Sequence, residues 1–314
     1  MCGKLEKRGF TIIEVLTVIS IIAILITLTV PSMNAARRYA KNVVQKGQFH
    51  DIEGALEVYK NEFGDYPDST DNGIDTKNPH DPSHYCGAMK LCEAMMGKDG
   101  LGLNIDSNFT CDHSDPGGGF PLYAWEPVPP PPEDNLRNRH EPYLAGRGFE
   151  RYPIFEVLKG STVFTCNVNS AATARCEVIS DAFHRFRDVH ISPMGERRKK
   201  VGMPVLYFKA VEYGVGHEYT GASSYNEDNN IYSILDNLAL IEHVWPRMED
   251  EYHEWARARE PDGGGPAKFY EDTRDSAVAA LSVPHNTDSY ILVSAGWDGL
   301  YGTHDDIFNF TDAK

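Results

Sequence analysis

We predict an α+β fold in which one long N-terminal α-helix packs on an antiparallel β-sheet that carries large, loop-rich insertions. The 314-residue sequence has helical patterning from Phe10 to Phe63, first as an apolar run and then as an amphipathic stripe. Short strand patterns occur much later, in residues 163–179, 205–212 and 289–294. A short helix is expected in residues 83–96, and the remaining middle of the chain is rich in Pro and Gly.

The composition limits the classes of partner that the chain is expected to bind. Apolar residues make up 41% and charged residues 24% of the chain, which is typical of a globular protein. There are 46 acidic and 30 basic residues, giving a net charge of −16. Binding to nucleic-acid phosphates depends on clustered Lys and Arg, so we expect no nucleic-acid partner.

Residues 10–30 are predicted to span a membrane. This run rises about 32 Å as a helix, close to the ~30 Å of a bilayer core, and its apolar side chains cover every face. No small-residue cleavage site follows it, so the span is expected to be retained and any processing to occur before it. Residues 1–9 are short and basic and are predicted to be a leader peptide.

Glu14 is unusual because it places a carboxylate inside this apolar run. An acidic residue within a membrane helix costs roughly 2.5–3.5 kcal/mol on insertion scales. Cleavage between Gly9 and Phe10 would free an amine four residues away, which could neutralise Glu14 on the same chain or across a subunit contact. An uncleaved signal anchor with a stray Glu is the alternative.

These residues resemble a known family. The string from Lys7 to Leu16, KRGFTIIEVL, is similar to the processing site of type IV pilins and type II secretion pseudopilins. The resemblance implies a pilin-like fold, cleavage between Gly9 and Phe10 by a prepilin peptidase, and N-methylation of Phe10. It also implies that Glu14 pairs with the amine of a neighbouring subunit, and that Pro31 is a helix-bending proline.

The helix is predicted to continue as an amphipathic extension over residues 31–63. One apolar stripe should pack on the chain's own globular domain, and a second stripe on a rotated face could contact neighbours in a filament. A core helix without a partner role is the alternative. Gly64 is expected to cap the end of the helix. The first stripe is Phe49, Ile52, Leu56, Tyr59 and Phe63, and the second is Met33, Ala36, Ala40 and Val43.

A glycine-rich acidic loop, residues 296–307, follows the last strand pattern. It holds three glycines and three carboxylates, Asp298, Asp305 and Asp306. Ca²⁺ takes six to eight oxygen ligands, and such a loop can add backbone carbonyls to carboxylates. The spacing is not that of an EF-hand, and a solvated acidic turn is the alternative reading.

This loop resembles the calcium-binding loop of G-type, or major, pseudopilins in its run from Asp298 to Ile307. The resemblance implies one structural Ca²⁺, without which the terminal segment should loosen. The implied side-chain ligands are Asp298, Asp305 and Asp306, and the implied carbonyl donors are Leu300, Tyr301 and Thr303.

The cysteine pattern fits an exported protein. Cys166 and Cys176 bracket a short segment, so we predict a hairpin disulfide between them. One further pair is expected among Cys86, Cys92 and Cys111. Zinc is the alternative for that region, although the spacing matches no zinc pattern; the candidate ligands are those three cysteines with His80, His84 and His113.

No catalytic motif stands out, so we expect a structural protein and not an enzyme. The resemblance implies a subunit of a type II secretion pseudopilus in the bacterial inner membrane, with a single span and residues 64–314 in the periplasm. Its expected partners are copies of itself, other pseudopilins, a prepilin peptidase and the inner-membrane assembly platform. A type IV pilin or minor pilin, or an exported binding or enzyme domain on a pilin-like anchor, are the alternatives.

Overall fold

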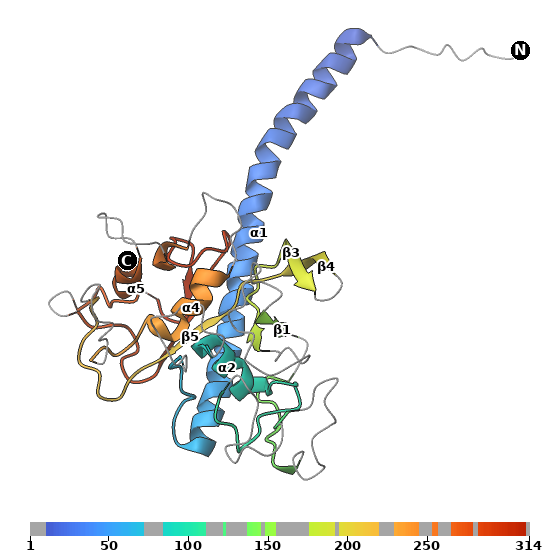
Figure 1. Ribbon diagram of the computed structural model, residues 1–314. Helices are drawn as coiled ribbons and strands as arrows, with labels where there is room; N and C mark the ends of the chain where they lie inside the picture. Colours follow the sequence, from blue (N-terminus) through green and yellow to red (C-terminus); the bar gives the residue numbers. More distant parts are fainter. Residues whose placement is uncertain are drawn as a thin grey trace, which may run out of the picture. The chain divides into compact units, whose positions relative to one another are not determined.

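The structure is a computed structural model that describes residues 11–71, 84–110, 122–123, 137–145, 148–154, 176–191, 195–219, 229–244, 253–256, 265–278 and 282–311. The chain forms two compact units, Met1–Val43 and Val44–Lys314. Helix α1, Ile12–Phe63, is 52 residues long and contributes to both (Figure 1).

Helix α1 ends where the sequence predicts. Gly64 adopts a φ of 88°, which only glycine reaches without strain, and its N–H donates to the carbonyl of Lys60 at 2.7 Å. Within the second unit, the stripe that includes Phe49, Ile52 and Leu56 is buried, as predicted. Phe63, at the end of the stripe, is 41% exposed and stacks on Tyr59 with ring centroids 4.5 Å apart.

The described strands form three antiparallel sheets. The first pairs β1, Arg151–Pro153, with β2, Glu177–Ile179, and the second pairs β3, Arg185–Ile191, with β4, Gly195–Val201. The third has the order β5-β6-β7, with bounds Leu206–Lys209, Tyr290–Ser294 and Ile307–Phe308.

The β5-β6-β7 sheet is buried on both faces. Tyr207 and Leu292 belong to the same hydrophobic cluster as the buried residues of α1, whereas their strand neighbours Leu206, Phe208 and Val293 belong to the opposite cluster. This alternation is the two-residue period of a strand. Burial on both faces explains why β6 is a continuous apolar run, since every residue from Tyr290 to Ser294 is buried.

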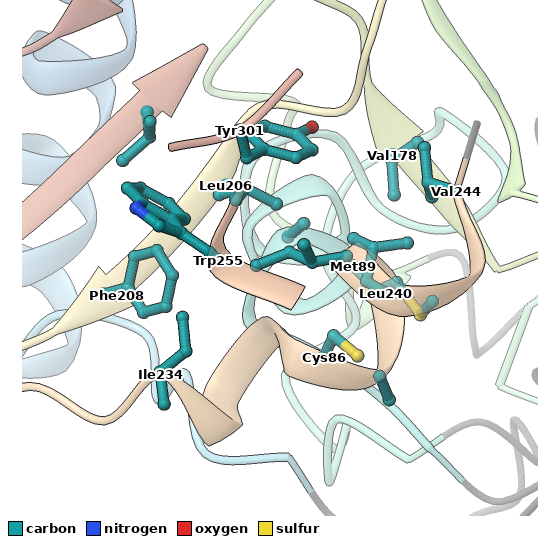
Figure 2. Close-up of a cluster of buried hydrophobic side chains, with 14 of the residues drawn as sticks. Cys86, Met89, Val178, Leu206, Phe208, Ile234, Leu240, Val244, Trp255 and Tyr301 are labelled. Carbon is teal, nitrogen blue, oxygen red and sulfur yellow. The ribbon is translucent and has the colours of Figure 1, made fainter. Parts of the chain in front are cut away.

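Short helices cover the second face of that sheet. They are α4, Leu235–His243, the 3₁₀ turn η2, Glu254–Ala256, and α5, Pro266–Asp272. Figure 2 shows Leu206 and Phe208 packed with Leu240, Trp255 and Tyr301 in this cluster. Trp255 and Tyr301 are completely buried. The residues just before and within the C-terminal loop are therefore part of the core.

Helix α2, Gly87–Met96, confirms the short helix expected in residues 83–96, with a later start. Cys86 and Cys92 are both buried free thiols, so the expectation of a pair among Cys86, Cys92 and Cys111 was wrong. Cys166 lies outside the described residues, so its disulfide with Cys176 stays a prediction.

Two of the predicted strand segments overlap strands of the structure. The strand expected over residues 205–212 is confirmed but spans Leu206–Lys209. The hairpin expected over residues 163–179 lies mostly outside the described residues, and its last segment, β2, pairs with β1. No sequence pattern indicates β1, because an Arg-Tyr-Pro tripeptide is too short to show a period.

Candidate assembly helix and calcium loop

The N-terminal half of α1 exposes every apolar side chain that the sequence placed there. Its length and composition suit a membrane span, and none of the most apolar window is buried. The hydroxyls of Ser20 and Thr29 donate back to the carbonyls of Leu16 and Leu25 at 2.7 and 2.9 Å. Such local bonds satisfy polar groups where there is no water.

Glu14 forms a capping box at the start of this helix. Its carboxylate accepts hydrogen bonds from the backbone N–H and the hydroxyl of Thr11, both at 2.8 Å, while the N–H of Glu14 donates to the Thr11 hydroxyl at 3.3 Å. The carboxylate thus has a local role as well as the predicted role in assembly. Gly9 and Phe10 lie outside the described residues.

Pro31 lies inside α1 and does not end it. A proline removes one helical N–H, so the carbonyl four residues earlier, on Thr27, loses its usual donor. Beyond Pro31, the second predicted stripe is exposed, as a face for neighbouring subunits would be. It comprises Met33, Ala36, Ala40 and Val43.

Two buried glutamines attach α1 to the rest of the second unit. Gln48 donates through Nε2 to the carbonyl of Ser180 at 2.7 Å, and Gln45 accepts from the N–H of Ala182 at 2.7 Å. Both glutamines lie on the buried face next to Phe49. The apolar stripe predicted this face, but polar residues on it could not be assigned partners from the sequence.

The C-terminal loop brings two of its three predicted carboxylates together. The backbone N–H of Asp298 donates to Asp305 at 2.9 Å. The hydroxyl of Thr303 lies 2.9 Å from Asp298 Oδ2, 2.7 Å from Asp305 Oδ1 and 3.3 Å from the carbonyl of Leu300. A hydroxyl has one proton and can donate to one of these oxygens at a time. The loop therefore holds more acceptor oxygens around Thr303 than the hydroxyl proton can satisfy.

The electrostatics of the pair follow from this crowding. Burial, reinforced by the neighbouring Asp305, raises the pKa of Asp298. Burial acts in the same direction on Asp305, but hydrogen bonds from Thr303 and the Asp298 N–H outweigh it and hold the pKa of Asp305 below its usual value.

Asp306 points elsewhere in the loop. One of its oxygens accepts from the N–H of Gly302 at 2.7 Å, and the other, Oδ1, is buried without a hydrogen-bond partner. Among the predicted carbonyl donors, that of Tyr301 accepts from the N–H of Glu254 at 2.9 Å, and that of Thr303 lies 3.3 Å from the N–H of Asp306.

The chemistry of this donor set fits Ca²⁺, because every candidate ligand is an oxygen and one carboxylate oxygen is orphaned. In the part of the chain that the structure describes, no three His, Cys, Asp or Glu side chains are close enough to form a metal-binding group. A bound cation would therefore need Asp306 to turn toward Asp298 and Asp305. For the zinc alternative, His84, Cys86 and Cys92 form no such group, and His80, Cys111 and His113 lie outside the described residues.

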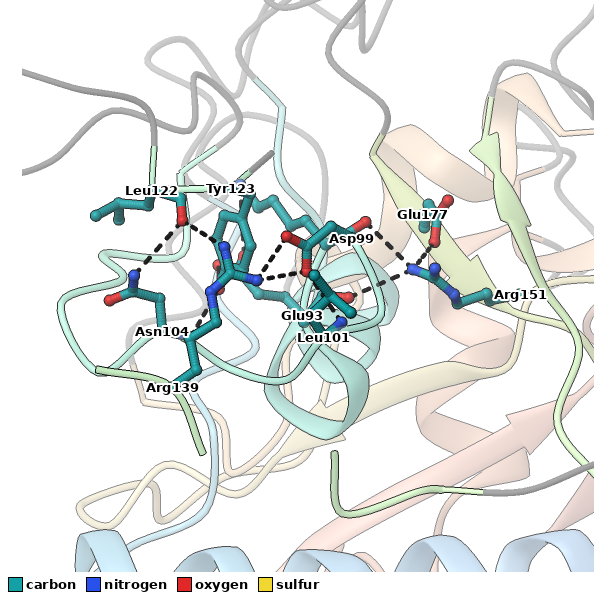
Figure 3. Close-up of polar contacts among 11 residues, drawn as sticks. Glu93, Asp99, Leu101, Asn104, Leu122, Tyr123, Arg139, Arg151 and Glu177 are labelled. Atoms are coloured by element: carbon teal, nitrogen blue, oxygen red, sulfur yellow. Dashed lines mark hydrogen bonds and ion pairs between the residues drawn. The ribbon is translucent and has the colours of Figure 1, made fainter. Parts of the chain in front are cut away.

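The middle of the chain contains a buried polar network that the sequence did not reveal (Figure 3). Glu93, on α2, accepts from the hydroxyls of Tyr85 and Tyr123 at 2.5 and 2.8 Å and also from Ser107. Lys98 lies 3.5 Å from Glu93, and both side chains are almost fully buried. Nearby, Arg139 and Arg151 hold Asp99 and Glu177 in ion pairs. This network joins the segments that pack around α2.

Comparison with known proteins agrees with the N-terminal pattern. Residues 5–30 match the family described as the prokaryotic N-terminal methylation motif. The chain is 39% identical over 70 residues to the type II secretion system core protein G of Pseudomonas aeruginosa, covering 22% of this chain and 49% of that protein. It is 34% identical over 69 residues to the core protein G of Klebsiella pneumoniae, covering 22% and 49%.

The N-terminal part of the chain is therefore similar to that of G-type pseudopilins. The chain spans about half the length of the relatives it matches, and no solved structure matches it. The long helix, antiparallel sheets and loop-rich regions confirm the predicted pilin-like α+β fold. The motif and the apolar helix indicate membrane anchoring through the N-terminus.

Proposed function

We propose that this chain is a structural subunit of a type II secretion pseudopilus. One observation carries the proposal: a single 52-residue helix begins within a methylation motif, exposes its apolar first half and buries one face of its second half in a folded domain. Such a helix can hold a subunit in the membrane and then pack against other subunits, and the similar proteins are named as core proteins of type II secretion systems.

The proposal includes the processing steps. A prepilin peptidase removes residues 1–9, Phe10 is N-methylated, and the new amine pairs with Glu14 of a neighbouring subunit. Other pseudopilins and the inner-membrane assembly platform are the remaining partners. The chain acts by assembly and not by catalysis, with residues 64–314 in the periplasm.

The experiment follows the mature protein in its native host. We expect mass spectrometry to find chains that begin at methylated Phe10 and membrane cross-linking to give a ladder of multimers. Glu14→Ala should remove the ladder while the protein stays in the membrane, and Thr17→Ala is a matched control in the same turn. Purified chains that still begin at Met1 would contradict the proposal.

A functional readout separates secretion from the pilus alternative. Loss of this subunit should stop the export of folded proteins across the outer membrane and leave twitching motility and DNA uptake intact. The reverse outcome would assign the chain to a type IV pilus.

Calcium is proposed as a structural ligand of the C-terminal loop, held by Asp298, Asp305 and Asp306. A ligand that binds the folded state stabilises it by mass action, about 2.7 kcal/mol at a hundred times its Kd. We therefore expect EGTA to lower the melting temperature of the wild type, and Asp305→Asn to remove this effect. Asp275→Asn, outside the loop, should keep it.

A further inference from the structure

The β3–β4 hairpin is a basic surface in an acidic protein. Six of the residues in its two strands are Arg or Lys and two are Asp or Glu, whereas the whole chain has a net charge of −16. The strands pair with each other over seven positions and with no other described strand. A two-stranded hairpin contributes little stability by itself. Stability of the fold therefore does not explain why basic residues are concentrated in this hairpin.

The described charged side chains of the hairpin are exposed, whereas Val201 at its end is buried. Arg198, Lys199 and Lys200 are exposed, and Phe186 is 66% exposed with the Arg198 guanidinium 5.6 Å from its ring centroid. An exposed phenylalanine under a cation is a common element of a contact surface. The hairpin therefore offers both charge and apolar area to a partner.

A second surface of the same domain carries the opposite charge. A cavity of about 650 Å³ lies between the loop after α1 and the residues after β5. Five carboxyl groups and one lysine line it: Asp65, Asp68, Glu212, Asp236, Asp288 and Lys209.

Part of this negative charge is uncompensated. Asp65 pairs with Lys209 at 2.5 Å, and Asp68 pairs with Lys90 at 2.6 Å. Glu212 and Asp288 are exposed, and no cation of the described residues lies within ion-pair distance of either. Val211 and Tyr213 stand exposed at the same rim and add apolar area.

The two surfaces lie at opposite ends of the soluble half of α1. Gln48 donates a hydrogen bond to the carbonyl of Ser180, which lies five residues before the hairpin begins. The cavity begins at Gly64, sixteen residues after Gln48 along the chain. That separation is about 24 Å of helix. Figure 1 likewise shows β3 and β4 well away from the C-terminal end of α1. The hairpin of one chain is thus placed to meet another chain's cavity rather than its own.

We propose that the β3–β4 hairpin of one copy of this chain docks against the acidic cavity of a second copy. The contact joins two different patches of the same chain, so it is heterologous and can repeat from subunit to subunit, as a filament requires. The inference rests on the proposed function, in which the helices bring copies together. An anionic membrane would also attract the hairpin, but it would leave the acidic, partly apolar rim of the cavity without a partner.

Cross-linking of the full-length protein in its native membrane tests the contact. Tagged chains carry Lys199→Cys and untagged chains carry Glu212→Cys, and a short bismaleimide joins them. We expect mixed dimers from this pair, and few when Glu271→Cys, an exposed acid on α5, replaces Glu212→Cys. Chains without an added cysteine measure the background from native thiols.

Charge reversal then tests the cause. Like charges brought together at an interface weaken it strongly, so Arg198→Glu with Lys200→Glu should lower the yield of mixed dimers about tenfold. Asp288→Lys in the partner chain should restore much of that yield. The proposal would be overturned if the yield of mixed dimers did not change with these charge reversals, or if Lys199→Cys chains alone formed dimers.

A third cysteine distinguishes failure of the docking contact from failure of the proposed pseudopilus function. Val18→Cys, in the apolar half of α1, reports contacts between helices. Helix cross-links without the Lys199–Glu212 product would overturn the docking contact and leave the pseudopilus intact. Loss of both products would overturn the pseudopilus and the docking contact together. Weaker binding of the reversed hairpin to phosphatidylglycerol vesicles, with cross-linking unchanged, would assign it to the membrane.

Discussion

Removing the charge of Glu93 should destabilise the fold more than any other isosteric change in the buried network. The Glu93 carboxylate is fully buried, accepts from three hydroxyls and lies 3.5 Å from Lys98, which is 4% exposed. Glu93→Gln keeps the shape but leaves Lys98 as a buried cation without its counter-ion. Breaking a buried pair from one side costs about 3–5 kcal/mol, a large part of the roughly 5–15 kcal/mol that folds a domain.

Urea unfolding of the full-length protein in detergent measures this cost, with tryptophan fluorescence as the signal because Trp255 is buried. Replacing both partners, in Glu93→Gln with Lys98→Met, removes the unpaired charge and should recover at least about 2 kcal/mol. Lys268→Met breaks a partly exposed pair with Asp272 and should cost only about 0.5 kcal/mol. A Glu93→Gln protein as stable as the Lys268→Met protein would refute the reasoning.

Three further changes test other parts of the fold. Burial raises the pKa of Asp236 to about 7, so the folded state keeps the Asp236 proton while the unfolded state loses it near pH 4. The free energy of unfolding should therefore fall as pH rises from 4 to 7. Asp236→Asn should flatten that slope in urea titrations. Leu56→Ala should cost about 3 kcal/mol in the same assay because Leu56 is fully buried, whereas exposed Val58→Ala should cost well under 1 kcal/mol. Gly302→Ala should lower the melting temperature, since its φ is 88° and a Cβ would lie 2.6 Å from a tryptophan ring, whereas Gly47→Ala, with open space around it, should not.

The parts that the sequence predicted are those in which a local pattern decides the structure. The long helix followed from uninterrupted apolar spacing, and its end followed from Gly64, because a left-handed residue is needed there. Strand β6 followed from a run of apolar residues between polar ones. In each case the residues that form the element also carry the signal.

The hairpin β3–β4 was missed for the opposite reason. Its strands are dominated by charged residues, so the sequence has no apolar alternation to reveal them. The network around Glu93 was missed because its members, Tyr85, Lys98 and Tyr123, come together only after distant segments fold around α2. The acidic cavity likewise joins residues near 65, 210 and 288. Long-range partners of polar residues have no signature in a single sequence.

The C-terminal loop contacts the β3–β4 hairpin. Arg185, the first residue of the basic hairpin, donates to the backbone carbonyl of Asp298 at 3.1 Å and lies over the ring of Trp297. Ser294, just before the loop, donates to Asp181, which is buried near the base of the same hairpin. One hydrogen bond therefore joins the acidic loop to the hairpin, and a second joins the segments that precede them. Because a cation in the loop would restrain the same backbone that Arg185 contacts, calcium binding and the docking contact between copies should strengthen together, although their residues are far apart in the sequence.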